Sequence, residues 1–390
     1  MKKLVAVCTI AFTILGCNDM KKNEIRESQV LPLAASPIGN NDSVKGVSAP
    51  FTAYMNDQLL VAGGCNFPGL PPSQGGKKQY YKEIYAYTPK ENVWRQIGSL
   101  PNELAYGASV VYGDEWICLG GNNNEGSFGS VYVIRMHNGE CNISSLPDLP
   151  AAMDNFAAVE SGKKLYVAGG NSDGMARNSV YVLDLEKQDG WERIADFPGA
   201  TRIQPQLLRG MNGTVLLLGG FQGGSVTEAP VLPTTVYCYD PVSVSWTEKN
   251  SLPLSSVNGE PLAMVGGFGV NINDSTLLIG GGVDRVIFTE ALDAERQISL
   301  AREKGETIRV DSLIAAKKSY LTHPVEWYAF NSDIYILHLK SNEWEYAGTF
   351  PQSARAGAGA AMQGQTLYVV DGELKPGVRT DEVNAIRFDF

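Results

Sequence analysis

A carboxylate and a guanidinium stand six residues apart near the C-terminal end of the chain, at Glu373 and Arg379. Glutamate transfers protons in acid–base catalysis, and arginine binds carboxylates through two parallel hydrogen bonds. Pro376-Gly377 lies between them and is a turn signal, so the chain should fold back and bring the two side chains together. The segment therefore predicts proton transfer on an anionic substrate. The alternative is a structural Glu–Arg ion pair on a loop.

The element that must position this pair is the last of six copies of one pattern. Each copy has an apolar strand that ends in Gly-Gly, at 59–64, 116–121, 165–170, 215–220 and 277–282, with the variant LYVVDG at 367–372. A second strand follows, at 84–87, 131–134, 180–183, 236–239, 334–337 and 383–386. Leu-Pro or Phe-Pro closes five copies, at Pro101, Pro147, Pro198, Pro253 and Pro351. In four copies a tryptophan precedes this closing signal, at Trp94, Trp191, Trp246 and Trp344. Short strands at regular spacing, punctuated by Gly and Pro, predict four antiparallel strands in each copy.

Val30-Leu31-Pro32 near the N-terminus supplies the closing signal that the sixth copy lacks. A strand there would complete the blade begun at 355–390, which closes the ring and removes a free sheet edge. The pattern resembles the kelch repeat, and hence implies an all-β fold, a six-bladed kelch-type β-propeller. The alternative is a β-sandwich. We expect residues 29–390 to form this single domain.

Strand parity predicts which face of the propeller binds a ligand. In an antiparallel meander, the loops after Gly-Gly and the connections after Leu-Pro emerge on the same face, and binding residues concentrate on such loops. The connections carry side chains that suit a polyol or a sugar acid, namely Tyr106, Asn155, Arg202 and Gln204. Each of them could instead be an ordinary solvated loop residue.

The longest irregularity in the repeats is an insertion in the fifth blade, at about 284–325. Residues 288–305 have helical apolar spacing and end at Gly305, and residues 310–321 predict a second short helix. By parity the insertion lies on the ligand face, where it could cap the central pocket as a lid. The alternative is a surface decoration packed on its own blade.

The N-terminus is typical of a targeting segment. Lys2 and Lys3 precede an apolar stretch that is too short to span a bilayer, which indicates a signal peptide over residues 1–16. Ile14-Leu15-Gly16-Cys17 resembles a bacterial lipobox, so we expect lipidation of Cys17, a tether over 17–28, and a lipid-anchored lipoprotein of the bacterial cell envelope. The alternatives are an ordinary secretory signal or a short membrane anchor.

Composition excludes several partners. The chain has 32 Lys and Arg against 42 Asp and Glu, a formal charge of −10, which argues against nucleic acid and against docking on anionic lipid. Membrane contact is then expected only through the lipid. His137, His323 and His338 lack paired metal spacing, so we expect neither a metal nor a cofactor. Four further cysteines show no disulfide framework and should fill apolar gaps: Cys65, Cys118, Cys141 and Cys238. The oligomeric state is left open.

The segment G-E-x-K-P-G-x-R-T-D at 372–381 resembles the signature of the N-acetylneuraminate epimerase family, the bacterial sialic acid mutarotases. The resemblance extends from about residue 45 to the end of the chain, and includes the helical insertion, SNEWEYAGTFP (341–351) and FPGATRIQPQ (197–206). It implies interconversion of the α and β anomers of a sialic acid. The Glu–Arg blade is last here rather than mid-chain, so the repeats look cyclically permuted, as in the branch of cyclically permuted mutarotases.

The resemblance also implies roles for individual residues. Glu373 matches the proton acceptor and Arg379 the arginine of the catalytic site, which would hold the substrate carboxylate. Arg202 and Gln204 match pocket positions, and we count Asn155, Tyr106 and Lys375 with the substrate-binding residues.

Two other functions are compatible with the same repeats. A propeller can bind sialoglycans or proteins without catalysis, because a fold does not fix an activity. A glycosidase would need a second carboxylate on the other side of the scissile bond.

Overall fold

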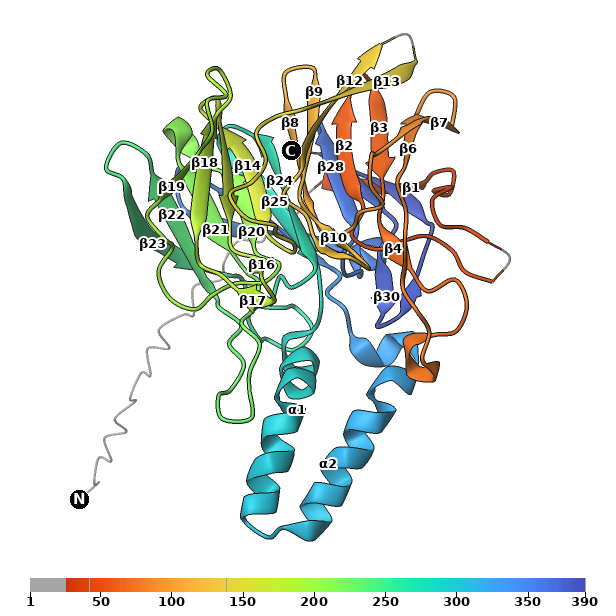
Figure 1. The fold of residues 1–390 in the computed structure, drawn as a ribbon, viewed down its shortest axis with the longest axis vertical. Coiled ribbons are helices and arrows are strands. Elements are labelled where there is room, and N and C mark those ends of the chain that lie inside the picture. The colour runs from red at the N-terminus through yellow and green to blue at the C-terminus, as the bar shows by residue number, and fades with distance from the viewer. Residues whose placement is uncertain (1–25, 42, 138, 390) are drawn as a thin grey trace, which may run out of the picture.

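The computed structural model describes residues 26–41, 43–137 and 139–389, and in these residues the main strands form six four-stranded antiparallel sheets. The first three blades are β2 (Phe51–Met55), β3 (Gln58–Ala62), β6 (Glu83–Thr88) and β7 (Val93–Ser99); β8 (Ala108–Tyr112), β9 (Glu115–Leu119), β12 (Val131–His137) and β13 (Glu140–Ser145); and β14 (Ala157–Ser161), β15 (Lys164–Ala168), β18 (Val180–Asp184) and β19 (Trp191–Ile194). The predicted six-bladed propeller is confirmed (Figure 1).

The other three blades contain the insertion and the closure. They are β20 (Gln206–Arg209), β21 (Val215–Leu218), β22 (Thr235–Asp240) and β23 (Ser245–Ser251); β24 (Gly267–Asn273), β25 (Thr276–Gly281), β26 (Asp333–His338) and β27 (Glu343–Thr349); and β28 (Gly359–Gln363), β29 (Thr366–Val370), β32 (Val383–Asp389) and β1 (Arg26–Pro32). The first strand of each blade contacts the first strand of the next, and β28 contacts β2, so these strands form a closed ring around the axis.

The N-terminal strand completes the last blade, as the sequence predicts. β1 pairs antiparallel with β32, with Val30 opposite Ile386 and Pro32 opposite Asn384. The strand begins at Arg26, inside the stretch 17–28 that we expected to be a tether. The expected signal peptide over 1–16 and the lipidation site Cys17 lie outside the described residues.

The repeated tryptophans fasten four of the six blades to the blade before them. The indole nitrogen of each donates a 2.9 Å hydrogen bond to a backbone carbonyl of the preceding blade, from Trp94 to Ala34, Trp191 to Pro147, Trp246 to Ala195 and Trp344 to Ser251. Between the blades lie clusters of fully buried side chains such as Trp116 and Leu60. The core is therefore distributed around the ring, and each blade depends on its neighbours.

The cysteines behave as small apolar side chains. Cys65, Cys118 and Cys238 are buried, Cys141 is half-buried, and all four thiols are free. Burial raises the pKa of the Cys118 thiol well above its ordinary value, which keeps it protonated and unreactive.

Four short hairpins follow the Gly-Gly positions on one edge of the propeller. They are β4 (Cys65–Asn66) with β5 (Gln79–Tyr80), β10 (Asn122–Asn123) with β11 (Gly126–Ser127), β16 (Asn171–Ser172) with β17 (Met175–Ala176), and β30 (Glu373–Lys375) with β31 (Val378–Arg379). Figure 1 shows β4, β10, β16 and β30 at the same edge, from which the helices also project. The parity argument therefore placed these loops on the correct common face.

The insertion is a pair of helices, as expected. α1 (Arg285–Glu303) begins at Asp284, whose side chain accepts a hydrogen bond from the backbone nitrogen of Ile287, and α2 (Thr307–Ser319) follows the turn at Gly305. Short 3-10 helices occur at η1 (Pro72–Gln74), η2 (Met211–Gly213), η3 (Tyr320–Thr322), η4 (Val325–Tyr328) and η5 (Pro351–Ser353). Neither helix of the insertion, nor any other in the described residues, is long and apolar enough to cross a membrane.

Candidate active site

The β30–β31 hairpin brings Glu373 and Arg379 together. The two residues are direct partners in the hairpin, and the Arg379 guanidinium donates to Glu373 Oε1 at 2.8 Å. Gly377 in the turn has a φ of 87° and donates its backbone N–H to the same oxygen at 2.6 Å. A Cβ at Gly377 would lie 2.4 Å from Pro72, so this turn requires glycine both for its conformation and for the approach of the neighbouring loop. The convergence predicted from Pro376-Gly377 is therefore present.

Glu373 Oε2 is left unoccupied by these contacts. Both hydrogen bonds to the carboxylate end on Oε1, and no residue that the structure describes donates to Oε2. The Glu373 side chain is 22% exposed, whereas that of Arg379 is only 2% exposed. The carboxylate is thus held at one oxygen and open at the other, which is the arrangement that a general base requires.

Arg379 stays charged in spite of its burial. Burial opposes the charge, but the Glu373 carboxylate, with Tyr106 and Cys65, raises the pKa of Arg379 above its ordinary value. The guanidinium also lies 5.1 Å from the centre of the Phe67 ring, a cation–π contact. These contacts lock the guanidinium against Glu373.

Tyr106 lies within electrostatic range of this pair. Burial, and then the nearby Cys65 and Glu373, raise the pKa of Tyr106 well above its ordinary value, although Arg379 lowers it. The phenol therefore remains protonated. Its oxygen accepts hydrogen bonds from Lys78 Nζ at 3.2 Å and from the Cys65 thiol at 3.5 Å. Lys78 comes from the loop between β4 and β5, so two blades meet at this phenol.

Tyr106, Asn155 and Gln204 occupy equivalent positions in successive blades. Their φ values are 60°, 53° and 53°, and each lies just before the innermost strand of its blade. The backbone N–H of Asn155 donates to Tyr106 O, and that of Gln204 donates to Asn155 O, both at 2.7 Å. Gln204 Nε2 also donates to Asn155 Oδ1 at 2.9 Å. The structure therefore brings these three predicted residues together on one ring at the mouth of the central axis.

A buried carboxylate organises the polar side chains of this ring. Asp154 is 6% exposed and accepts hydrogen bonds from Ser127 Oγ at 2.5 Å, Asn155 Nδ2 at 2.5 Å and Asn171 Nδ2 at 3.2 Å. Asp154 fixes the orientation of both asparagines, and so presents a rigid amide surface beside the axis.

Arg202 and Lys375 are not part of this group. Arg202 is 1% exposed, and its guanidinium donates to the backbone carbonyls of Gly219 and Thr235, each at 3.2 Å. Burial lowers the pKa of Arg202 to about 10. Lys375 Nζ donates to the carbonyl of His323 at 2.5 Å, which ties β30 to the insertion. In the structure both cations donate to backbone carbonyls, and their contact with a substrate stays a prediction.

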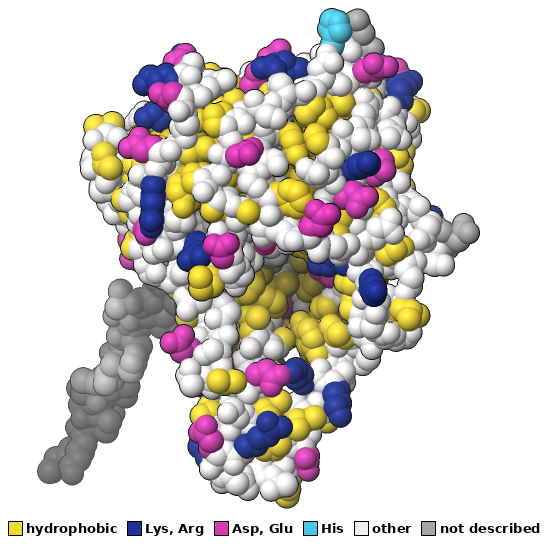
Figure 2. Space-filling view, viewed as in Figure 1, with side chains coloured by type: hydrophobic (Ala, Val, Ile, Leu, Met, Phe, Trp, Pro, Cys, Tyr) yellow, Lys and Arg dark blue, Asp and Glu magenta, His cyan; other side chains and the backbone are white. Residues whose placement is uncertain are grey.

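The returning end of the insertion forms one wall of the site. η4 lies against β30, and η3 lies against η1. Burial, then Tyr328 and Glu373, raise the pKa of Tyr320 to about 12, and burial followed by Glu373 raises that of Tyr328. Both phenols are therefore close to Glu373. Figure 2 shows the surface hollowed between the propeller and the helices, with hydrophobic side chains in the hollow.

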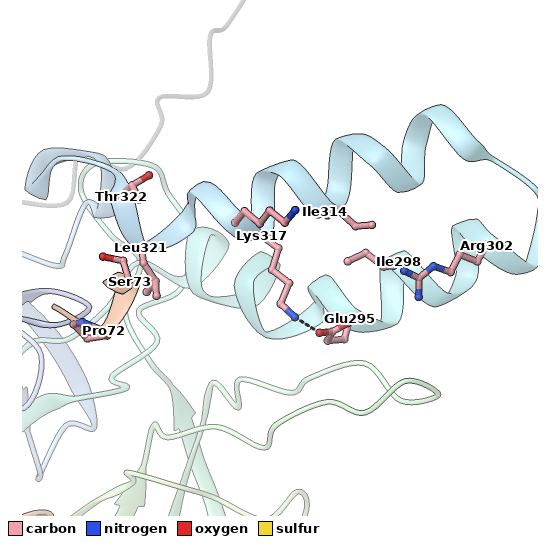
Figure 3. Close-up of a pocket in the computed structure, with 10 residues that line it drawn as sticks. Pro72, Ser73, Glu295, Ile298, Arg302, Ile314, Lys317, Leu321 and Thr322 are labelled. Carbon is pink, nitrogen blue, oxygen red and sulfur yellow. Dashed lines mark hydrogen bonds and ion pairs between the residues drawn. The ribbon is translucent and has the colours of Figure 1, made fainter. Parts of the chain in front are cut away.

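The helices themselves point away from the blades and enclose a separate cavity (Figures 1 and 3). This cavity has a volume of about 530 Å³ and is lined by Pro72, Ser73, Glu295, Ile298, Arg302, Ile314, Lys317, Lys318, Leu321 and Thr322. The cavity adjoins the group around Glu373 through Pro72, which packs on Gly377, and through Leu321 and Thr322 of η3, but Glu373 and Arg379 do not line it. The segment of the insertion from η3 to η4 borders the site, and closure of the helices as a lid stays a prediction.

No group of three or more His, Cys, Asp or Glu side chains in the described residues could hold a metal ion. The chemistry available at this site is that of Glu373, the phenols, the cations beside them and the amides of the ring.

Comparison with known proteins identifies the family. The family model for N-acetylneuraminate epimerase matches residues 15–143 and 146–390. The chain belongs to this family. An N-acetylneuraminate epimerase of Salmonella arizonae is 33% identical over 243 residues, 62% of this chain and 58% of that protein. One of Haemophilus influenzae is 30% identical over 248 residues, 63% of this chain and 60% of that protein. The solved structure of YjhT has a TM-score of 0.49 and 25% sequence identity, and the match covers 61% of this chain and 64% of that chain.

The chain thus spans about three fifths of the length of the curated family members that it matches. If the blades of this chain come in a cyclically permuted order, an alignment that runs in one direction along both chains can match the blades on only one side of the point of permutation. A permuted blade order would therefore give partial coverage of this kind. The permutation itself stays a prediction.

Sequence reasoning missed Lys78, Asp154, Phe67, Tyr320 and Tyr328. One signal for the ring was available, because the residue after each Gly-Gly falls at one repeat position. These residues are Cys65, Asn122, Asn171, Phe221, Val283 and Glu373. Glu373 is the single carboxylate at that position, which marks the sixth blade as the one with catalytic potential in this family fold.

Proposed function

We propose that this protein interconverts the α and β anomers of N-acetylneuraminate, with Glu373 as the general base. The observation that carries the proposal is the asymmetric carboxylate, bound by Arg379 and Gly377 at Oε1 and open at Oε2. Membership of the N-acetylneuraminate epimerase family supports the choice of substrate. The phenols, amides and cations around Glu373 suit a polyhydroxylated acid.

The reaction needs a single proton and no co-reactant. Glu373 Oε2 takes the proton of the anomeric hydroxyl while the bond between the anomeric carbon and the ring oxygen breaks and a carbonyl forms. The ring oxygen takes up a proton as it leaves, and Glu373 can return the one that it holds. Closure on the opposite face of the carbonyl reverses both transfers. Arg379 holds Glu373 by its hydrogen bond to Oε1 and so acts as a positioning residue.

The rigid ring supplies orientation. Asn155 and Gln204 are linked to each other, and Asp154 holds Asn155 from the other side, so their amides meet a bound sugar without reorganising. The protonated phenol of Tyr106 can donate a hydrogen bond to a sugar oxygen beside Glu373. Preorganised donors of this kind favour catalysis over loose binding.

The test is the rate of anomer equilibration. α-N-acetylneuraminate released by a sialidase is followed by NMR, with wild type, with Glu373→Gln and without protein. We expect wild type to accelerate equilibration and Glu373→Gln to lose roughly 100- to 10,000-fold of the catalysed rate. An unchanged rate with wild type would refute the enzyme and leave a sugar-binding propeller. Release of reducing sugar from a sialoside would instead indicate a glycosidase.

We also propose that the protein is a lipid-anchored lipoprotein of the bacterial cell envelope. The support is the sequence Ile14-Leu15-Gly16-Cys17 after a basic and apolar leader. Labelling with a fatty-acid analogue in cells should mark wild type and should not mark Cys17→Ser. Equal labelling of both proteins would overturn the proposal.

A further inference from the structure

Arg379 is poorly placed to receive a substrate carboxylate. Its side chain is 2% exposed, NH1 is bound to Glu373 Oε1, and the guanidinium packs over Phe67. An anion arriving from solvent would meet a guanidinium that is almost wholly buried and already donates one N–H to Glu373. A substrate carboxylate bound there would share the charge of one guanidinium with the carboxylate of the base.

Lys78 is the accessible cation beside the same group. Its side chain is half-buried on the loop that leads into β5, and Nζ donates to Tyr106 OH at 3.2 Å. Nζ also lies 4.7 Å from the centre of the Tyr106 ring and 5.9 Å from that of Tyr80. The two rings hold the ammonium in place, while only one of its three N–H groups is used by a described residue.

The charge of Lys78 is not neutralised within the protein. No carboxylate among the described residues lies within 4.0 Å of its Nζ, although many other lysines and arginines of the chain are paired. Lys78 and Arg379 carry two positive charges, and Glu373 and Asp154 are the two carboxylates of this group, each of them held by hydrogen bonds from other residues. Of the two cations, Arg379 is paired with Glu373, whereas Lys78 has no carboxylate partner among the described residues.

We propose that Lys78 binds the carboxylate of the acidic sugar, with Tyr106 beside it, and that Arg379 serves Glu373 alone. This inference rests on the proposed function and assigns to Lys78 the contact that the family resemblance gave to Arg379. In a sialic acid the carboxylate is attached to the anomeric carbon itself. A carboxylate held at Lys78 beside Tyr106 therefore brings the anomeric hydroxyl into the neighbourhood of Glu373.

The test compares an acid substrate with its uncharged ester. Lys78→Met keeps the aliphatic stem over the rings but removes the charge, and Lys78→Arg restores the charge. Lys77→Met is the matched control, because Lys77 is the adjacent lysine and is exposed. Each variant is assayed for anomer equilibration of N-acetylneuraminate and of its methyl ester, with affinity measured separately by ligand-observed NMR.

We expect Lys78→Met to raise the KM for the acid roughly 10- to 100-fold, the value of one charged hydrogen bond. The KM for the ester should change little, and kcat for the acid should stay close to wild type, because the carboxylate keeps its charge throughout the reaction. Lys78→Arg should recover most of the affinity for the acid, and Lys77→Met should match wild type with both ligands.

Several outcomes would overturn the inference. With an active wild type, an equal effect of Lys78→Met on the acid and the ester, or no effect on either, would refute a contact with the carboxylate. A loss of kcat with unchanged KM would equally contradict a role in binding. If wild type does not accelerate equilibration at all, the proposed function fails. In that case the affinities from ligand-observed NMR still test the anion site. Weaker binding of N-acetylneuraminate by Lys78→Met than by Lys77→Met would support the site, and equal binding by the two variants would refute it. Thermal unfolding of each variant, together with the Lys78→Arg rescue, separates these results from a folding defect.

Discussion

Substitutions in the Glu373–Arg379 pair should change the stability of the protein and its catalytic activity independently of each other. In Glu373→Gln the neutral side chain keeps an acceptor oxygen for Arg379 and Gly377, but a guanidinium that is 2% exposed loses its counter-charge. Removing one partner of a buried pair costs about 3–5 kcal/mol. Glu373 is 22% exposed and glutamine retains the hydrogen bonds, so we expect a loss of about 2–3 kcal/mol in the free energy of unfolding.

The size of the chain sets the thermal shift. Unfolding entropy of about 2.1 cal/mol/K per residue gives about 0.8 kcal/mol/K for 390 residues. Glu373→Gln should therefore lower Tm by about 2–4 °C. The double variant Glu373→Gln with Arg379→Met removes both charges, and replacement of a buried pair by apolar groups is often neutral. It should recover most of the lost Tm while remaining inactive.

The assay is a double-mutant cycle. Thermal unfolding of wild type, both single variants and the double variant is followed by circular dichroism, with anomer equilibration measured on the same samples. Equal Tm values for wild type and Glu373→Gln would refute the dependence of Arg379 on this carboxylate. A double variant less stable than Glu373→Gln would refute the charge argument, because cavity and packing effects would then dominate.

Three further variants probe the surroundings of the site. Burial raises the pKa of Asp371 well above its ordinary value, although Ser36 and Arg355 lower it. The free energy of unfolding is therefore unaffected by this group below its unfolded-state pKa of about 4, and it falls as the pH rises from there towards the folded-state pKa. Asp371→Asn should therefore raise Tm at pH 8, where wild type pays this cost, and a lower Tm there would contradict the burial argument. Asparagine also suits the φ of 55° at this position. Arg202→Met should lower Tm through the lost bonds to Gly219 and Thr235 but leave the KM unchanged, and a selective rise in KM would restore Arg202 to the pocket. Tyr106→Phe should reduce kcat/KM roughly 10-fold, because the variant lacks the hydroxyl that would form a hydrogen bond with the substrate. Unchanged kinetics would exclude the phenol from the site.

Local signals were sufficient for most of the fold. The Gly-Gly strands and the closing prolines predict six blades, and Val30-Leu31-Pro32 predicts the strand that closes the ring. The helical spacing over 288–305 likewise predicts α1. These features depend on hydrophobic periodicity and on turn residues, which are local properties of a few neighbouring residues. They can therefore be recognised without knowledge of the tertiary structure.

The Glu373–Arg379 contact was predictable for the same reason. Both residues lie on one hairpin, and Pro376-Gly377 specifies the turn between them. Tyr106, Asn155 and Gln204 could be placed on the correct face because the strand count fixes parity, and their equivalence follows from the repeat.

What the sequence by itself determined is therefore the ring of blades, its closure, the helical insertion and the Glu373–Arg379 hairpin. Only the tertiary structure decided which cations face the site. Lys78 reaches Tyr106 through a long irregular loop of another blade, and Arg202 turns into the protein to satisfy backbone carbonyls. The direction of such a side chain is set by which carbonyls and rings surround it, and that depends on contacts between segments far apart in the chain.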